Sequence, residues 1–296
     1  NNPVPDGTTV NFTTEGGTIQ PSCTTTNGNC SVEWKSTQPY PENHRATILA
    51  TAEGHEFFVD VNGNNTYDDG DGGAANSELS NNPHVNSGLD RIGPLTSGFV
   101  DMEEAWRDDN ENGEHDSGEL FIDANNNKTQ DTANGVFNGP QCSGDNCAET
   151  NFVTIRKAAV IIMSGSNPLF RLQENGGNII YSDYGEATVG ISSIARGDIQ
   201  EYIVDISDIA LQTLPEDTSV SVDTSVGEVN GETSFSIGRT IGTSDPNAYG
   251  GRRFSFNLKN TLAQDVTIDS DTATVNIKIT TDGGLETTLT FNVTLE

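Results

Sequence analysis

Three stretches of the sequence repeat one spacing of side chains that carry oxygen. Each has Asp at position 1, Asn at positions 3 and 5, and Asp at position 9. In a tight loop, alternate side chains turn inward and the carbonyl of position 7 fills the gap between them, so this spacing is typical of calcium-binding loops. The predicted ligands at positions 1, 3, 5, 7 and 9 are Asp60, Asn62, Asn64, Thr66 and Asp68; Asp108, Asn110, Asn112, Glu114 and Asp116; and Asp123, Asn125, Asn127, Thr129 and Asp131.

These loops, named loops 1, 2 and 3 in chain order, differ at positions 6 and 12. Loop 2 has Gly113 at position 6, where the chain must turn sharply, and Glu119 at position 12, whose carboxylate can bind through both oxygens. Loop 1 has the shorter Asp71 at position 12. Loop 3 has Lys128 at position 6 and Asn134 at position 12, so its sequence argues less strongly for calcium binding. We therefore expect two to three bound calcium ions.

Other interpretations of these acidic stretches are weaker. A disordered acidic segment does not need large apolar residues, yet Phe58, Trp106 and Phe121 punctuate this one. A helix-loop-helix switch needs long amphipathic helices, which the flanks lack. The acids have no aromatic-rich cleft beside them for glycosidase chemistry, and the four histidines form no HExxH motif. We therefore expect no enzymatic activity, and we expect weak, extracellular calcium sites because Asn lowers the ligand charge.

The charge of the chain also favours bound cations. The formal net charge is -30, which repels nucleic acid phosphates and anionic membrane surfaces. Between Glu53 and Asp131 there are 19 acidic residues and three basic ones, Arg91, Arg107 and Lys128. A folded segment with that excess needs counter-charge, and no basic tract supplies it. No apolar stretch reaches the length of about 20 residues that a membrane span needs, so we expect neither nucleic acid nor membrane insertion.

The four cysteines form two close pairs in the sequence. Cys23 and Cys30 flank one turn-rich stretch, and Cys142 and Cys147 flank another. Two local pairs favour disulfides over a zinc site, which would need four ligands converging from separate places. The cysteines therefore predict two disulfides and an exported, extracellular or cell-surface protein.

The elements that must position these loops are short strands. The chain has 31 Gly and 32% hydrophobic residues, and short runs rich in Val and Ile are separated by polar turns. The stretch from Pro5 to Ile19 also aligns with the stretch from Pro215 to Val229, each a turn followed by an alternating strand. We therefore expect an all-β chain of two domains, 1–165 and 172–296, linked near Ser164 to Leu172.

The two copies differ in what precedes them. Strand-like sequence at residues 185–194 and 198–211 comes before the second copy, whereas four residues precede Pro5. The first domain thus is expected to lack about two opening strands. Either these strands belong to a longer protein, or another chain donates a strand to the open edge.

The N-terminal residues carry a family resemblance. The sequence NPVPDGTTVNFTTEGGTIQPS, followed by the turn TTTNGN and the strand CSVEWKS, resembles bacterial immunoglobulin-like domains of invasin/intimin type, which occur in tandem on surface adhesins. The resemblance returns at ETNFVTIRKAAVIIMSGS, expected as the closing strand, and is looser in the second domain. An insertion at about residues 55–140 departs from the family. The resemblance implies two immunoglobulin-like β-sandwiches and a surface role, and no catalytic residues.

These observations together predict a structural or adhesive role. We expect a calcium-stabilised repeat unit of a bacterial surface adhesin or extracellular filament. Its expected partners are neighbouring immunoglobulin-like domains or copies of itself, joined by strand donation, and an unknown surface ligand. The alternative is a glycan- or protein-binding accessory module of a secreted protein.

Overall fold

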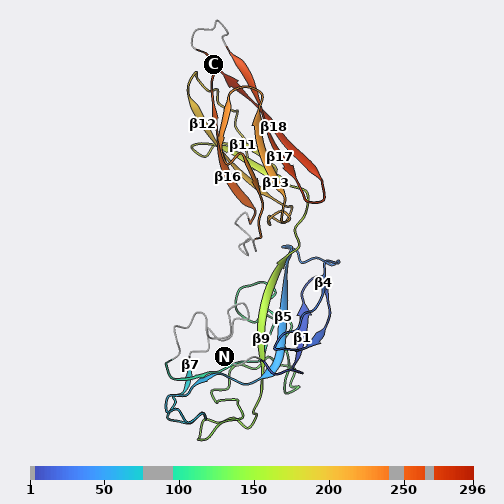
Figure 1. The fold of residues 1–296 in the computed structure, drawn as a ribbon, viewed down its shortest axis with the longest axis vertical. Helices are drawn as coiled ribbons and strands as arrows, with labels where there is room; N and C mark the ends of the chain where they lie inside the picture. Colours follow the sequence, from blue (N-terminus) through green and yellow to red (C-terminus); the bar gives the residue numbers. More distant parts are fainter. Residues whose placement is uncertain (1–3, 76–95, 240–249, 264–269) are drawn as a thin grey trace. The chain divides into compact units, whose positions relative to one another are not determined.

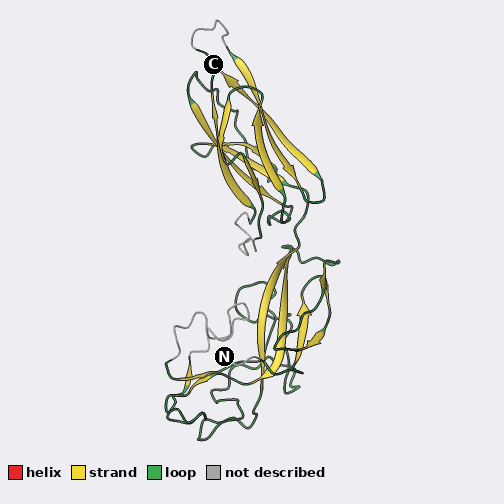
Figure 2. Cartoon of the chain, viewed as in Figure 1, coloured by secondary structure: helices red, strands yellow, loops and turns green. Residues whose placement is uncertain are grey.

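The computed structural model describes residues 4–75, 96–239, 250–263 and 270–296, and these residues contain strands and loops but no helix (Figures 1 and 2). The predicted all-β class is confirmed. The chain divides into two compact units. Unit 1 comprises Asn1–Pro41 and Arg45–Ile161, and unit 2 comprises Glu42–His44 and Ile162–Glu296. The division falls just before the predicted link.

Unit 2 is a sandwich of two antiparallel sheets. Residues from both sheets form one apolar core, which includes Tyr202, Phe256, Val220 and Ile277. The first sheet has the order β11 (Ile179–Ser182), β10 (Leu169–Glu174), β12 (Ile199–Ser207), β16 (Arg252–Lys259) and β14 (Glu228–Gly231), and the second has the order β15 (Ser234–Ser236), β13 (Ser219–Thr224), β17 (Asp271–Thr280) and β18 (Glu286–Leu295).

The alternating sequence of unit 2 explains its sheets. In β17 the residues Ala273, Val275, Ile277 and Ile279 are fully buried, while the residues between them are Thr, Asn and Lys. Successive side chains of a strand point to opposite faces, so this pattern puts one apolar face on the core. One expected strand is wrong: in residues 185–194 only Ile194 makes a bridge, to Leu295.

Unit 1 repeats part of this topology. In the described part of unit 1, one sheet has the order β3 (Ser22–Thr24), β1 (Thr9–Thr14), β5 (Arg45–Gly54) and β9 (Val153–Ile162), and a second pairs β2 (Thr18–Ile19) with β4 (Trp34–Lys35). The order β3-β1-β5-β9 matches the order β15-β13-β17-β18, and the aligned stretches place β1 at the position of β13. The internal repeat predicted from the sequence is therefore a structural repeat.

The insertion takes the place of a hairpin turn. In unit 2, β17 and β18 are joined by residues 281–285, whereas in unit 1 the corresponding β5 and β9 are joined by residues 55–152. The described residues of this insertion, 55–75 and 96–152, hold three short strands, β6 (Phe58–Val59), β7 (Ala74–Ala75) and β8 (Gly98–Val100), and are otherwise loop (Figure 2). Both ends of the insertion thus start from neighbouring strands of one sheet (Figure 1).

The two faces of the unit 1 sheet have different surroundings. On one face, Thr47 and Arg45 of β5 are buried and contact the insertion. The other, here called the inner face, carries Val10, Phe12, Ile48, Ala50 and Ala52. Their counterparts in unit 2 are buried against the five-stranded sheet, but the inner face of unit 1 is only half-buried. The described part of unit 1 has no counterparts of β10, β11 and β12.

Candidate metal centres

Loop 1 is organised by hydrogen bonds to its first carboxylate. Asp60 accepts the backbone N–H groups of Asn64 at 3.1 Å and Asn65 at 2.7 Å, which are positions 5 and 6. The side-chain oxygen of Asn62 accepts the N–H of Asn64 at 3.0 Å, and that of Asn64 accepts the N–H of Thr66 at 2.7 Å. The oxygens at positions 1, 3 and 5 are thus held by hydrogen bonds to the backbone of one turn.

Loops 2 and 3 have the same frame. In each, the position-1 carboxylate accepts the N–H groups of positions 5 and 6, at 3.0 and 2.8 Å in both loops. The position-3 amide oxygen accepts the N–H of position 5, and the position-5 amide oxygen accepts that of position 7. Three separate stretches therefore fold alike because they share one residue spacing.

Position 6 has a left-handed backbone in all three loops. The φ angles are 60° at Asn65, 83° at Gly113 and 67° at Lys128. Gly and Asn adopt this conformation readily, whereas Lys does so at a steric cost. The sharp turn predicted at position 6 is therefore present even where the residue is unfavourable.

The position-9 carboxylate faces the two amides. In each loop, the side-chain nitrogens of positions 3 and 5 donate to one oxygen of this Asp, over distances of 2.5 to 2.9 Å. The Asn62 amide, with the backbone N–H of Gly70 and the Asn64 amide, lowers the pKa of Asp68; the amides of loop 2 lower the pKa of Asp116 in the same way. These carboxylates therefore carry full negative charge at neutral pH.

Position 12 closes loops 1 and 2 in one manner. Asp71 accepts the N–H groups of Val61 at 2.8 Å and Asp68 at 3.0 Å, which are positions 2 and 9. Glu119 accepts the N–H groups of the same two positions in loop 2, at 2.8 and 2.9 Å. The ligands predicted for these loops are thus brought together in the expected order, from position 1 to position 12.

Loop 3 is closed by a residue outside it. Glu104 accepts the N–H groups of Ala124 at 2.8 Å and Asp131 at 3.2 Å, which are positions 2 and 9 of loop 3. Asn134, which stands at position 12 in the sequence, binds elsewhere. The sequence contains a signal for this role of Glu104. It stands four residues before the first ligand of loop 2, just as Glu119, which also closes a loop, stands four residues before the first ligand of loop 3.

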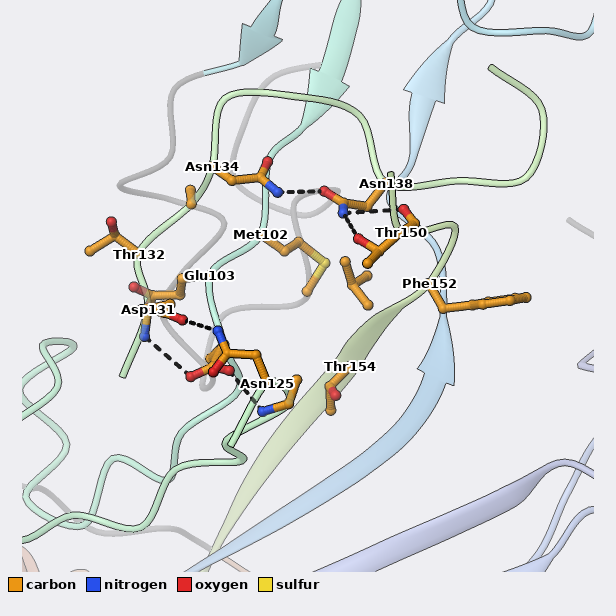
Figure 3. Close-up of a pocket in the computed structure, with 14 residues that line it drawn as sticks. Met102, Glu103, Asn125, Asp131, Thr132, Asn134, Asn138, Thr150, Phe152 and Thr154 are labelled. Carbon is orange, nitrogen blue, oxygen red and sulfur yellow. Dashed lines mark hydrogen bonds between the residues drawn. The ribbon is translucent and has the colours of Figure 1, made fainter. Parts of the chain in front are cut away.

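A cavity of about 540 Å³ lies beside loop 3 and strand β9 (Figure 3). The amide of Asn125 and the carboxylate of Asp131 face one another at its wall, and Asn134 points toward Asn138, which in turn bonds to Thr150. The lining is polar on this side, so the cavity suits water and ions better than a large apolar ligand.

Loop 2 is fixed to the unit 1 sheet. Thr47 of β5 donates to the carbonyl of Asp108 at 3.0 Å. Arg45 of β5 forms a two-point ion pair with Glu111, at 2.5 and 2.8 Å, and both side chains are largely buried. Glu111, an acidic residue of loop 2 outside the predicted ligand set, thus anchors the loop to the sheet.

Both predicted disulfides are present, Cys23–Cys30 and Cys142–Cys147. The second one lies against the insertion core. Tyr67, at position 8 of loop 1, pairs with Cys142, and Phe137 pairs with Cys147. The rings of Tyr67 and Phe137 are 4.7 Å apart between centroids. This small apolar cluster therefore supports loop 1 from behind.

The described residues contain no group of three His, Cys, Asp or Glu side chains gathered as a metal site. Besides the carboxylates, the predicted ligands of each loop are amide and carbonyl oxygens. Such mixed oxygen sets suit calcium rather than zinc or other softer metals. The residues present therefore fit a calcium ion, which would lie among positions 1, 3, 5, 7, 9 and 12.

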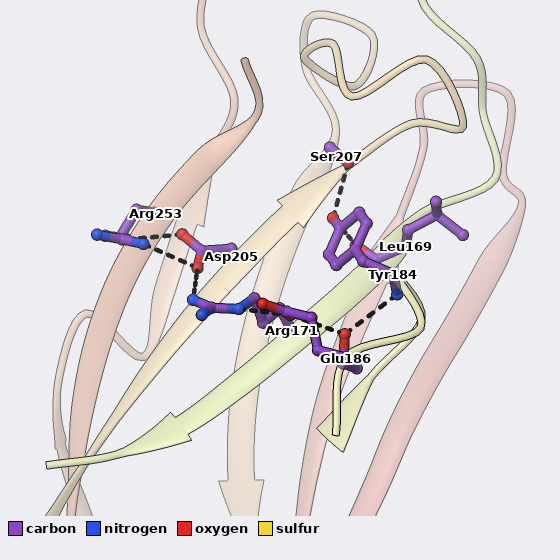
Figure 4. Close-up of polar contacts among 8 residues, drawn as sticks. Leu169, Arg171, Tyr184, Glu186, Asp205, Ser207 and Arg253 are labelled. Carbon is purple, nitrogen blue, oxygen red and sulfur yellow. Dashed lines mark hydrogen bonds and ion pairs between the residues drawn. The ribbon is translucent and has the colours of Figure 1, made fainter. Parts of the chain in front are cut away.

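A second polar cluster lies on unit 2 (Figure 4). Asp205 of β12 pairs with Arg253 of β16 at 2.6 Å and with Arg171 of β10 at 3.2 Å, and Arg171 also pairs with Glu186 at 2.7 Å. Tyr184 contacts Ser207 at 2.7 Å. Charges of opposite sign face each other across neighbouring strands, so this cluster stabilises the sheet.

Comparisons with known proteins identify no family. No family model matches the chain, and no curated protein matches it significantly. Among the described residues, no helix is long and apolar enough to cross a membrane.

Proposed function

We propose that this chain is a calcium-stabilised structural module of an exported bacterial surface protein, such as an adhesin or an extracellular filament, and not an enzyme. The observation that carries the proposal is the common frame of loops 1, 2 and 3. Three independent stretches hold carboxylate and amide oxygens in the same order, and the position-12 role is filled in each, by Asp71, Glu119 and Glu104. Calcium is the cation that such oxygen sets suit.

Calcium would act here as a structural clamp. The insertion is rich in acidic residues and has a small apolar cluster, namely Tyr67, Phe99 and Phe137. A cation that binds only the folded loop stabilises it by about 2.7 kcal/mol when its concentration is a hundred times the dissociation constant. Three such sites would contribute several kcal/mol to a segment that has little core of its own. The two disulfides suit the calcium-rich, oxidising exterior where such weak sites are filled.

The proposal includes a partner for the inner face of unit 1. This face is apolar and half-buried, and a groove of about 770 Å³ runs over it, lined among others by Val10, Phe12 and Ala52. In unit 2 the matching face is covered by β10, β12 and β16. We assign its cover to the inner face of unit 1 in a second copy of the chain, because two such faces can pack against each other as the sheets of a sandwich do.

Calorimetric titration of the full chain with calcium chloride tests the calcium proposal. We expect saturable binding with dissociation constants on the order of 0.1 to 1 mM and a rise in Tm that a chelator reverses. Asp108→Asn and Asp123→Asn should each remove one binding event, whereas Asp145→Asn, an exposed acid outside the loops, should not. No binding heat and no change in Tm would contradict the proposal.

A further inference from the structure

A buried carboxylate at the start of the insertion behaves as a position-12 residue without a loop. Glu56 has no exposed surface. Its two carboxylate oxygens accept the N–H groups of Met102 at 2.7 Å and Asn138 at 2.8 Å. In loops 1, 2 and 3 the position-12 role is to accept the N–H groups of positions 2 and 9. By this correspondence Met102 stands at position 2 and Asn138 at position 9, although they are far apart in the sequence.

The residues next to these two complete the correspondence. Asp101 accepts the N–H groups of Asn134 at 3.2 Å and Gly135 at 2.7 Å, as position 1 does from positions 5 and 6. The oxygen of Asn134 accepts the N–H of Val136 at 3.0 Å, and its nitrogen donates to the oxygen of Asn138 at 3.1 Å. Gly135 has a φ of 80°, as position 6 requires. Asn134 thus stands at position 5 of this arrangement.

Strand pairing gives an independent reason to class Asp101 with the other position-1 residues. Phe99 and Phe58 lie opposite each other in β8 and β6, and each precedes an Asp by two residues, Asp101 and Asp60. Trp106 and Phe121 also lie opposite each other, two residues before position 1 of loops 2 and 3. The four Asp residues therefore form two pairs with one geometry.

The position of Glu56 in the sequence repeats as well. Glu56 precedes Asp60 by four residues, as Glu104 precedes Asp108 and Glu119 precedes Asp123. Glu104 closes loop 3 and lies just before the first ligand of loop 2. Glu119 closes loop 2 and lies just before the first ligand of loop 3. Glu56 stands in that relation to loop 1, so its expected role is to close the partner of loop 1, which begins at Asp101.

The burial of charge is the second independent observation, and it points to a cation. Glu56 is fully buried and Asp101 is 4% exposed. The printed hydrogen bonds of the Glu56 carboxylate come from two backbone N–H groups, so among the described residues no basic side chain is bonded to it. A fully buried carboxylate is costly unless a positive charge neutralises it, so the burial of Glu56 points to a bound cation.

We propose that Glu56, Asp101, Asn134 and Asn138, with the carbonyl of Val136, bind a fourth divalent cation with the oxygen chemistry of calcium. The site is discontinuous, because its ligands come from three segments of the insertion. It has no counterpart of the position-3 amide, and Asn138 replaces the position-9 acid. The proposal rests on the calcium role of loops 1, 2 and 3, whose chemistry it extends. Its cation would join the start, middle and end of the insertion.

Native mass spectrometry of the full chain, with both disulfides intact and calcium acetate present, tests this site by counting bound ions. We expect Glu56→Gln and Asp101→Asn each to bind one calcium fewer than the wild type. Glu149→Gln, which removes an exposed acid from the same unit, should bind as many as the wild type. Circular dichroism checks that each variant is folded.

The outcomes separate the two proposals. If the wild type binds calcium and both folded variants bind the same number, the fourth site is wrong and the loops stand. If the wild type binds none, the calcium function itself is wrong. Should either variant fail to fold, a wild-type crystal soaked in terbium chloride decides: an anomalous peak between Glu56, Asp101 and Asn138 supports the site, and peaks confined to loops 1, 2 and 3 overturn it.

Discussion

Glu104 shows how one residue can serve a loop to which it does not belong. It accepts the N–H groups of Ala124 and Asp131 in loop 3, while its neighbour Glu103 holds the buried Arg156 of β9, through its carbonyl at 3.1 Å and its carboxylate at 3.5 Å. This neighbouring contact fixes the backbone on which Glu104 stands. The closing carboxylate of loop 3 is therefore positioned by the sheet and not by the loop.

The first prediction concerns this carboxylate. Glu104→Gln should weaken calcium binding at loop 3 by about tenfold or more, because the amide cannot offer two charged oxygens to the cation. Calorimetric titration would measure the loss as one weakened site. The control is Glu114→Gln, since position 7 is expected to contribute its carbonyl. Equal affinities for the wild type and Glu104→Gln would remove Glu104 from the ligand set.

How much of the site could be predicted depended on the distance between partners along the chain. The ligands of loops 1 and 2 lie within twelve consecutive positions, so spacing alone predicted their order. Glu104 and Asn134 could not be assigned in this way, because the fold brings the first into loop 3 and takes the second out of it. The repeated four-residue interval between Glu and Asp was in the sequence, but its meaning depends on the pairing of loops.

The decisive difference between the strands of the two units is how far their matching faces are covered. Strand β1 carries Val10 and Phe12, half-buried, where β13 carries Val220 and Val222, which are 1% and 6% exposed. The repeat of β1 in β13 was predictable because both alternate apolar and polar residues. The absence of a strand at residues 185–194 was not predictable. This segment mixes Gly and Ser with apolar residues, a composition that fits a loop as well as a strand.

We predict that the chain self-associates through the inner face of unit 1. The wild type should form dimers at high protein concentration in sedimentation velocity. The Val10→Lys variant should remain monomeric, because dimerisation would bury the charge of the lysine in the interface. Thr9→Lys is the matched control, since Thr9 is an exposed neighbour on the opposite face of β1. A wild type that stays monomeric throughout, or a Val10→Lys variant that still associates, would contradict a second copy as the cover.

The two units of the chain differ in what stabilises them. Unit 2 has a continuous apolar core contributed by both sheets. The insertion of unit 1 has the small cluster around Tyr67, Phe99 and Phe137, and buries acidic residues such as Glu56, Asp71 and Asp108. Burial of apolar surface is insensitive to calcium, whereas buried carboxylates are stabilised by a bound cation.

We therefore predict that chelation loosens the insertion first. Hydrogen–deuterium exchange should become faster in peptides of residues 55–75 and 96–140 when a chelator is added, whereas peptides of β12, β17 and β18 should be unchanged. The control is the same chelator saturated with calcium. Equal acceleration in both units would mean that calcium does not act through the insertion.

The contacts of Glu56 also bear on the order of folding. Loops 1 and 2 close over about twelve residues, which costs little chain entropy, but Glu56 meets Met102 and Asn138 across 46 and 82 residues. Long-range contacts form slowly. Where calcium is present, the local loops can therefore close first, whereas Glu56 must wait for Asn138 before its carboxylate leaves water. Until then, the Glu56 carboxylate stays in solvent and the insertion remains accessible to proteases.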